Sequence, residues 1–417
     1  MRKVSSYATA LLFSLCGGSL VLSPLALAKG DCPIDNRKSQ AVGERSGKKV
    51  QRSYEAYTNG SLDEAIGILL EVNPSDTFDK AYVARMLGNF YAEKGDMSAS
   101  RKYLKQAVDA DVLSGTDHAG TLRLYADILL QEKQFKEAIP YYYKWIDFTC
   151  KTNDATVYKR IGVAYTELEQ WDKVLEVANK GIELADKPDQ TLYQMKLTAY
   201  YNKKQYKNAV SVLETMIPIW QTEKRLWVQL AQFYVVTESY DKALATYDLA
   251  YKNGFLETEA NITRLAQLLN QKESPYRAAQ IYQKNLDNGM IPKNEKSYKL
   301  LATFYQNAKE SSDAAKYYGL AAEAGNDGEL YLRQGRLLSL EQEYKPAIAA
   351  FKKALDTGIK NPGEAQFELA LAYLNLKQYK PAYQNALLAA KDKKTERSAK
   401  SYISYIKEKA RINNITL

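Results

Sequence analysis

Small and bulky apolar residues recur along this chain at helical spacing. The pattern is clearest in residues 225–253, which contain in order Trp227, Leu230, Ala231, Tyr234, Ala243, Tyr247 and Ala250. Positions three or four apart lie on one face of an α-helix, so the stretch predicts two amphipathic helices joined by a short turn. Ala231 and Ala243 are expected where the two helices cross, because a larger side chain would hold the backbones apart.

The same pair of small positions recurs ten times. In the second helix of each pair the small position moves by 33 to 38 residues, through Ala65, Ser100, Ala138, Val174, Ala209, Ala243, Ala278, Ala314, Ala347 and Ala382. Twelve residues upstream of each, the first helix has Ser53, Gly88, Ala126, Gly162, Leu197, Ala231, Ala266, Ala302, Gly335 and Ala370. All but Leu197 are small, so the sequence predicts ten helical hairpins that bury their apolar faces against one another.

This arrangement resembles the tetratricopeptide repeat (TPR), whose period is about 34 residues. The resemblance covers residues 46–392 and implies an all-α, right-handed superhelical TPR solenoid of about ten helix-turn-helix repeats. Residues 29–45 are expected to form an N-terminal cap segment. Residues 393–417 are expected to form a C-terminal capping helix and tail, because the end repeats of a solenoid need a cover.

The first 28 residues predict a cleavable signal peptide. Met1-Arg2-Lys3 is a basic start, residues 8–27 are apolar, and Ala26-Leu27-Ala28 is a cleavage site. A lipid anchor at Cys16 is the alternative, but Phe13-Ser14-Leu15 lacks the small residue that such a site needs. No later segment is apolar enough to span a bilayer. We therefore expect the protein to be exported, which in a bacterium means to the periplasm. The mature chain is expected to have no transmembrane segment.

Two cysteines, Cys32 and Cys150, follow the expected cleavage point near Ala28. In an oxidising compartment an even pair of cysteines favours a disulfide. Such a bond would hold the N-terminal segment across the first three repeats and cover the open end of the solenoid. The alternative is two free thiols.

Charge and candidate chemistry argue against several classes of function. The chain carries a net charge of +9, and removal of Arg2 and Lys3 with the signal leaves 9 − 2 = +7. This modest excess, in an exported protein, favours a solvated basic surface over a nucleic-acid site. The single histidine, His118, cannot make a multi-ligand zinc site and is expected at a helix N-terminus or on the surface. No phosphate-binding loop or Cys/His cluster occurs, so we predict a non-enzymatic protein with no metal and no cofactor.

The TPR resemblance implies a concave face lined by the first helix of each repeat. In the second repeat this face would present Tyr82, Arg85 and Asn89. Arg85 and Asn89 resemble half of the clamp by which some TPR domains hold a C-terminal carboxylate, and Arg160 could supply a second cation. The third repeat offers Leu124 where that clamp uses asparagine. The alternative is a solvated arginine beside a helix cap.

Repeats five to eight present a row of neutral residues on the same face. They are Gln194, Thr198, Gln232, Thr263, Gln267, Asn270, Thr303 and Gln306. Amide and hydroxyl groups both donate and accept hydrogen bonds, which suits an extended peptide backbone. The alternative is an ordinary polar surface. This row is the predicted partner-binding groove.

A narrower resemblance comes from the segments CPIDNRKSQAVGERSGKKVQRSYEAY, FDKAYVARMLGNFYAEKGD, LQEKQF and WIDFTCK. These are similar to periplasmic TPR proteins encoded beside TonB-type transport systems in Gram-negative bacteria. The resemblance implies an adaptor that assists an ExbB–ExbD–TonB assembly in uptake, for example of ferric siderophores. The alternative is a scaffold for envelope assembly, such as polysaccharide export or outer-membrane biogenesis.

Overall fold

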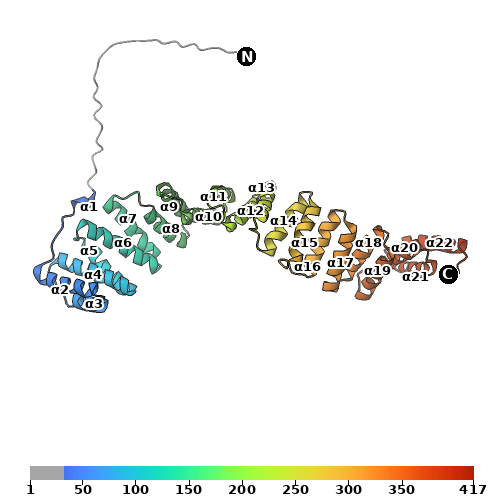
Figure 1. Cartoon of the computed structure of the whole chain (residues 1–417), viewed down its shortest axis with the longest axis horizontal. Coiled ribbons are helices and arrows are strands. Elements are labelled where there is room, and N and C mark those ends of the chain that lie inside the picture. The colour runs from blue at the N-terminus through green and yellow to red at the C-terminus, as the bar shows by residue number, and fades with distance from the viewer. Residues whose placement is uncertain (1–31) are drawn as a thin grey trace, which may run out of the picture. The chain divides into compact units, whose positions relative to one another are not determined.

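The computed structural model describes residues 32–417, and the described residues contain helices and no strand (Figure 1). The predicted signal peptide, residues 1–28, lies outside the described residues. Within the described part of the chain, no helix is long and apolar enough to cross a membrane. The chain divides into two units, residues 1–199 and residues 200–417, which meet within helix α10. Each unit is described by itself.

Unit one contains the first helices of the chain. They are α1 (Pro33–Asn36), α2 (Glu44–Thr58), α3 (Leu62–Leu70), α4 (Thr77–Lys94), α5 (Met97–Ala110), α6 (Gly115–Gln131), α7 (Phe135–Thr149), α8 (Ala155–Glu167), α9 (Trp171–Leu184) and most of α10 (Gln190–Asn202). Four hairpins, α2–α3 through α8–α9, follow one another in this unit.

Unit two contains the remaining helices. They are α11 (Tyr206–Ile219), α12 (Lys224–Val236), α13 (Tyr240–Lys252), α14 (Glu259–Gln271), α15 (Pro275–Asp287), α16 (Glu295–Asn307), α17 (Ser311–Gly325), α18 (Gly328–Leu340), α19 (Tyr344–Thr357), α20 (Pro362–Asn375), α21 (Tyr379–Ala389) and α22 (Glu396–Ile412). Five hairpins, α12–α13 through α20–α21, lie within this unit, and the succession α10 then α11 continues the pattern at the boundary.

The small positions predicted at the helix crossings are buried without exception. All ten small positions of the second helices have no exposed surface, from Ala65 to Ala382. In the first hairpin the Ser53 hydroxyl donates to the Ala65 carbonyl (2.7 Å), and in the second the Ser100 hydroxyl donates to the Gly88 carbonyl (2.7 Å). These contacts place the paired small residues directly against each other. The predicted all-α solenoid of helix-turn-helix repeats is therefore confirmed.

Each hairpin turns through one residue in the left-handed backbone region. This residue always lies five positions before the small residue of the second helix, and the ten are Gly60, Gly95, Lys133, Glu169, Lys204, Glu238, Glu273, Lys309, Gln342 and Lys377. Only Gly60 and Gly95 are glycines, although a side chain strains this conformation. The other eight turns carry a charged residue, or glutamine at Gln342, at a cost in stability.

Replacing Lys133 by glycine should therefore stabilise the protein. Lys133 has φ 60°, and glycine reaches this region without the contact between Cβ and the backbone. We expect a gain of about 0.5–1 kcal/mol in the free energy of unfolding, measured by urea denaturation. Gly95→Ala is the matched control. Gly95 has φ 84°, and nothing lies within 4 Å of an added Cβ. The expected decrease in the free energy of unfolding therefore measures backbone strain alone. An unchanged or lower stability of Lys133→Gly would contradict the argument.

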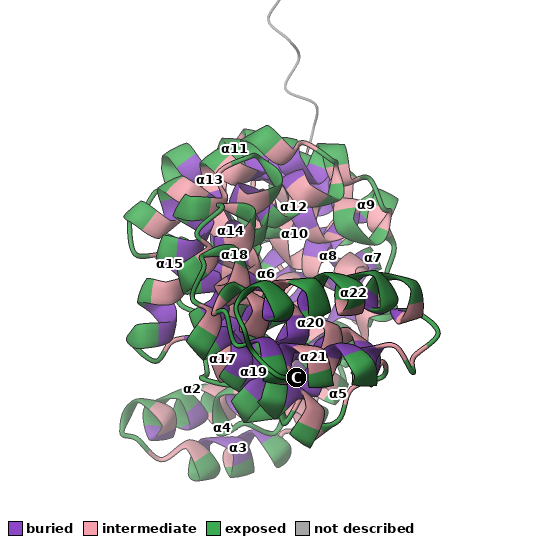
Figure 2. Cartoon of the chain, turned by 90° about the vertical axis from the view of Figure 1, so that its right-hand side faces the viewer, coloured by how far each residue is buried: buried purple, intermediate pink, exposed green. Residues whose placement is uncertain are grey.

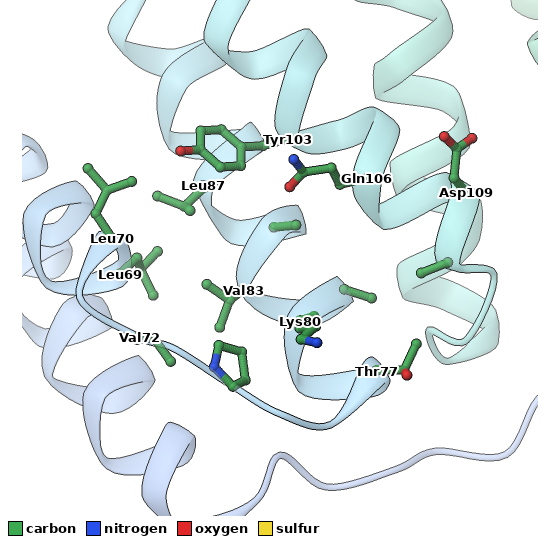
Figure 3. A pocket seen from close by; sticks show the side chains of 14 residues that line it. Leu69, Leu70, Val72, Thr77, Lys80, Val83, Leu87, Tyr103, Gln106 and Asp109 are labelled. Atoms are coloured by element: carbon green, nitrogen blue, oxygen red, sulfur yellow. The ribbon is translucent and has the colours of Figure 1, made fainter.

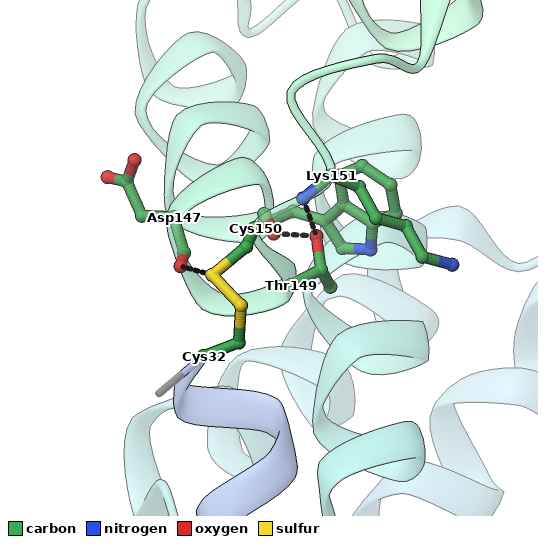
Figure 4. The surroundings of a disulfide bond; sticks show 6 residues. Cys32, Asp147, Thr149, Cys150 and Lys151 are labelled. Carbon is green, nitrogen blue, oxygen red and sulfur yellow. Dashed lines mark hydrogen bonds between the residues drawn. A yellow bond between two sulfur atoms is a disulfide. The ribbon is translucent and has the colours of Figure 1, made fainter. Parts of the chain in front are cut away.

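The N-terminal segment packs across the third hairpin. Cys32 and Cys150 form a disulfide with a Cα–Cα distance of 5.8 Å, which ties α1 to the end of α7 (Figure 4). Gly115 lies so close to the Ile34 carbonyl that a Cβ there would approach the oxygen within 2.4 Å. Further along, the Gly43 amide donates to Asp79 (3.0 Å). Residues 32–43 are therefore an integral part of unit one.

His118 lies in the first turn of α6, as expected, but not on the surface. Only 4% of it is exposed, and its ring lies edge-on to Phe148 at 4.8 Å between centroids. Arg37 of the N-terminal segment contacts the same phenylalanine ring, at 5.4 Å. Burial lowers the pKa of His118, although the negative charge of Asp111 acts in the opposite direction. The helix N-terminal alternative predicted for His118 therefore holds, and the surface alternative does not, because residues 32–43 cover this turn.

Candidate functional site

Four buried tyrosines lie beneath the face formed by the first helices. Tyr142, Tyr247, Tyr282 and Tyr318 each follow the small residue of their second helix by four positions, and each is at most 2% exposed. A tyrosine hydroxyl needs a partner when buried, and these hydroxyls point towards the first helix. The Tyr318 hydroxyl donates to Gln306 (2.8 Å) and lies 3.3 Å from the Thr303 hydroxyl.

Four of the six predicted groove residues of unit two, Gln232, Thr263, Thr303 and Gln306, interact with these tyrosines. Gln232 interacts with Tyr247, and Thr263 lies beside Tyr282. Burial raises the pKa of both tyrosines, so both remain protonated donors. Between hairpins, the Asn307 amide donates to the Asn270 side chain (2.9 Å), which links α14 and α16. The buried tyrosines thus position part of the polar row.

An open pocket of about 640 Å³ lies at one end of this row, between α16 and α18. Its polar lining residues are Lys299, Gln306, Asp327, Glu329, Arg333 and Arg336. Leu340 lies at its edge with 69% of its surface exposed. The pocket therefore combines charged groups with an apolar edge.

The carboxylates of the pocket accept hydrogen bonds from backbone amides, whereas two of its cations have no carboxylate partner among the described residues. Asp327 accepts a hydrogen bond from the Glu329 amide (2.8 Å), and Glu329 accepts one from the Lys360 amide (2.9 Å). Across the described residues, neither Lys299 nor Arg333 forms an ion pair. Arg333 lies over the Tyr318 ring, 4.9 Å from its centroid. The two cations are available to an anionic group.

Arg336 differs from these two cations because it joins neighbouring hairpins. It forms hydrogen-bonded ion pairs of 2.8 Å with both Glu364 and Glu368 of α20. The hydrogen bond from Arg336 lowers the pKa of Glu364. Arg336 therefore contributes to the packing of α18 on α20 rather than to the binding capacity of the pocket.

The cations of unit one that were expected to form a clamp have internal partners. Arg85 lies 3.2 Å from Asp117 and 5.0 Å from the centroid of the Tyr82 ring. Arg160 pairs with Asp127, which also accepts a hydrogen bond from Tyr142 (2.6 Å). A ligand carboxylate would have to displace Asp117 or Asp127. The clamp remains a prediction, and Asn89 is half-buried beside it.

These ion pairs belong to a repeated link between successive first helices. Arg123 pairs with Asp154 (2.7 Å), and Lys159 pairs with Asp189 (2.6 Å). Burial opposes ionisation of Asp154, but the hydrogen bond and charge of Arg123 outweigh it and lower the pKa of that carboxyl. The polar residues of this face in unit one therefore hold neighbouring hairpins together.

The remaining two predicted groove residues, Gln194 and Thr198, lie on α10 in unit one. Gln194 is exposed, and Thr198 is partly buried and already engaged. The other six lie in unit two. The predicted row is thus divided between the two units. The six residues on α12, α14 and α16 belong to the same unit and are considered together below.

The sequence analysis missed Asp127, Lys299, Arg333 and the tyrosines. Counted from the small residue, the equivalent of Asn89 in the third hairpin is Asp127 rather than Leu124. The tyrosines had a detectable signal, because the position four residues after the small residue is tyrosine in four hairpins. No sequence signal shows that Lys299 and Arg333 lack ion pairs, because ion pairing depends on residues of the neighbouring hairpin.

A second pocket, of about 600 Å³, opens between α3 and α5 in unit one (Figure 3). Leu69, Leu70 and Tyr103 surround its apolar end, and Lys80 and Asp109 lie at its polar end. It exists because α3 has only 9 residues, whereas α5 has 14, so α3 leaves part of α4 uncovered. None of the predicted site residues lines it. Among the described residues, no group of three or more His, Cys, Asp or Glu could hold a metal ion.

Comparison with known proteins supports the repeat assignment. Residues 34–160 match the family model described as the SusR N-terminal TPR domain. In this region the chain is similar to a TPR domain. The match begins within α1 and ends within α8, so the SusR-type TPR model includes the N-terminal segment as well as three hairpins. No curated protein matches the sequence.

Similar solved structures are TPR proteins of distant sequence. MamA from Desulfovibrio magneticus RS-1 is 21% identical over 44% of this chain and 99% of its own, with a TM-score of 0.36. The C-terminal part of a TPR repeat-containing protein from Cytophaga hutchinsonii is 17% identical over 58% and 96%, with a TM-score of 0.39. The TPR2AB domain of yeast Sti1, in a complex with pHSP90, is 21% identical over 62% and 98%, with a TM-score of 0.34.

Proposed function

We propose that this protein is a periplasmic interaction scaffold that holds an extended segment of a partner protein on the first-helix face of unit two. The observation that carries the proposal is the polar row of α14 and α16 beside a pocket with two unpaired cations. A TPR-type solenoid serves protein–protein interaction. The proposal adds the surface, the kind of segment and the compartment.

The geometry favours an extended segment with an acidic group and an apolar side chain. Gln267 is exposed on α14, and Gln306 is held by Tyr318 with its amide group still able to donate. Fixed donors and acceptors bind a peptide backbone with little loss of side-chain entropy. Lys299 and Arg333 would receive a side-chain or C-terminal carboxylate, and Leu340 would contact the apolar side chain.

We further propose that the partner belongs to a TonB-type energy-transducing system. The support is the similarity of the N-terminal segments, including WIDFTCK with Cys150, to periplasmic TPR proteins encoded beside such systems. The expected signal peptide and the Cys32–Cys150 bond agree with an oxidising compartment. In this role the protein is an accessory component for uptake, for example of iron.

Site-specific photocrosslinking in cells tests the proposal. A photoreactive residue at Gln267 should capture a TonB-system protein, whereas one at Lys284, exposed on the second helix α15, should not. Lys299→Glu combined with Arg333→Glu should abolish the Gln267 crosslink. Capture of unrelated envelope proteins, with normal iron uptake in a deletion strain, would overturn the TonB role. Equal crosslinking from Gln267 and Lys284 would overturn the proposed face.

A further inference from the structure

The C-terminal end of unit two carries a concentration of positive charge. Residues 391–411 contain eight Lys or Arg and three Asp or Glu, a net charge of 8 − 3 = +5. The whole chain carries +9, so these 21 residues hold more than half of its excess. The segment comprises the turn after α21 and nearly all of α22. This charge distribution needs an explanation beyond general solubility.

Most of these cations lack a carboxylate partner. Three of them form ion pairs, Lys394 with Glu364 (3.3 Å), Lys400 with Glu396 (2.6 Å) and Arg411 with Glu408 (2.8 Å). Within residues 32–417, the other five form none, namely Lys391, Lys393, Arg397, Lys407 and Lys409. Asp392 accepts a hydrogen bond from the Lys394 amide (2.9 Å). The acidic residues of the segment are therefore already engaged.

Exposed tyrosine and isoleucine side chains accompany the charges. Ala399, Ile406 and Ala410 are buried against the preceding helix, and Arg397, Tyr405 and Ile412 lie on the opposite side of α22. Tyr405 is 50% exposed and Ile412 is 59% exposed. Figure 2 shows α22 with a largely exposed outer surface. Within the described residues, no helix packs against this side of α22.

We propose that this basic end surface, formed by residues 391–412, binds the anionic headgroups of a membrane. Clusters of four to eight cations on an amphipathic helix bind anionic lipid surfaces, each cation contributing about fivefold to affinity at low salt. Tyrosine and long lysine side chains are favoured at the interface between headgroups and acyl chains. The protein binds from the aqueous side, through the end of unit two.

Composition favours a lipid surface over an acidic protein as the partner. Six of the eight cations are lysines. Lysine is depleted in protein–protein interfaces, where arginine is enriched instead. A headgroup layer imposes no such preference for a planar, bidentate donor, because lysine meets phosphate as a point charge. None of residues 391–412 lines the pocket between α16 and α18, so this surface can be tested separately from the partner site proposed above.

Vesicle sedimentation with the full mature chain tests the proposal. The protein should sediment with vesicles of equal parts phosphatidylglycerol and phosphatidylcholine, and should stay in solution with phosphatidylcholine alone. Lys391→Gln, Lys393→Gln and Arg397→Gln together should weaken binding roughly 100-fold at low salt. The matched control removes three charges elsewhere, by Lys136→Gln, Lys187→Gln and Lys293→Gln, all exposed positions, and should bind as the unchanged protein does.

A second variant separates the apolar contribution from the charge. Tyr405→Ser with Ile412→Ser leaves the net charge unchanged and should reduce binding severalfold, with an unaltered melting temperature as the check on folding. Equal loss in both triple variants would overturn the proposal, since binding would then follow net charge alone. Failure to bind the anionic vesicles would also overturn it, as would tighter binding to polyglutamate than to vesicles, which would assign the surface to an acidic protein.

Discussion

Reduction of the Cys32–Cys150 disulfide should lower the free energy of unfolding of unit one by about 4 kcal/mol. The two cysteines are 118 residues apart in sequence. Cross-linking a loop of this length removes much of the conformational entropy of the unfolded chain, and the estimate for about 100 residues is ~4–5 kcal/mol. Hydrogen exchange measured by mass spectrometry, with and without reductant, reports each region separately. Amides of α1, α6 and α7 should lose the most protection.

The disulfide also holds contacts that are too weak to persist alone. The short helix α1 has four residues, far below the length at which an isolated helix is stable. Two contacts of this segment depend on the disulfide. One joins the Ile34 carbonyl to Gly115, and the other joins the Arg37 side chain to the Phe148 ring. The double variant Cys32→Ser, Cys150→Ser should behave as the reduced protein and ignore reductant. Protection that falls equally in unit two, or does not fall at all, would contradict this account.

The sequence predicted the repeat register because packing at a helix crossing depends on side-chain size. Ala231 and Ala243 mark such a crossing in any order of hairpins, and both are fully buried. The disulfide partners could be named for a similar reason, since Cys32 and Cys150 are the only cysteines expected in the exported chain. In each case one physical requirement, small size or an even number of thiols, can be recognised from the residue type without knowledge of tertiary contacts.

The candidate site was less predictable because it depends on contacts between hairpins. Arg85 and Lys299 occupy the same position of their first helices, three residues before the small residue. Arg85 pairs with Asp117 of the next hairpin, whereas no carboxylate among residues 32–417 forms an ion pair with Lys299. A charge is available for binding only when its neighbour leaves it unpaired, and that neighbour lies more than 30 residues away. For these charged positions, the residue type alone therefore does not show whether the side chain is available to bind a partner.

Gly335→Ala should destabilise unit two by a net ~1 kcal/mol, although alanine is the better helix former. Gly335 is the small residue of α18, and a Cβ there would lie 2.4 Å from a ring carbon of Phe351. Phe351 is fully buried, so its ring cannot move away without disturbing the core. Overpacking of this kind costs about 1–3 kcal/mol, more than the ~1 kcal/mol that alanine contributes to a helix. Urea denaturation of the variant and the unchanged protein measures the difference.

A glycine with open space around it supplies the control. Gly120 lies on the exposed side of α6 with nothing within 4 Å of an added Cβ, so Gly120→Ala should stabilise by about 0.5–1 kcal/mol. Shortening the opposing side chain should restore part of the loss, so Gly335→Ala with Phe351→Leu should be more stable than the two single effects predict. Strict additivity of the two substitutions would mean that the residue at position 335 does not press on Phe351. Close contact would then not explain the small residues at the crossings, and the register of the hairpins would lose its physical basis.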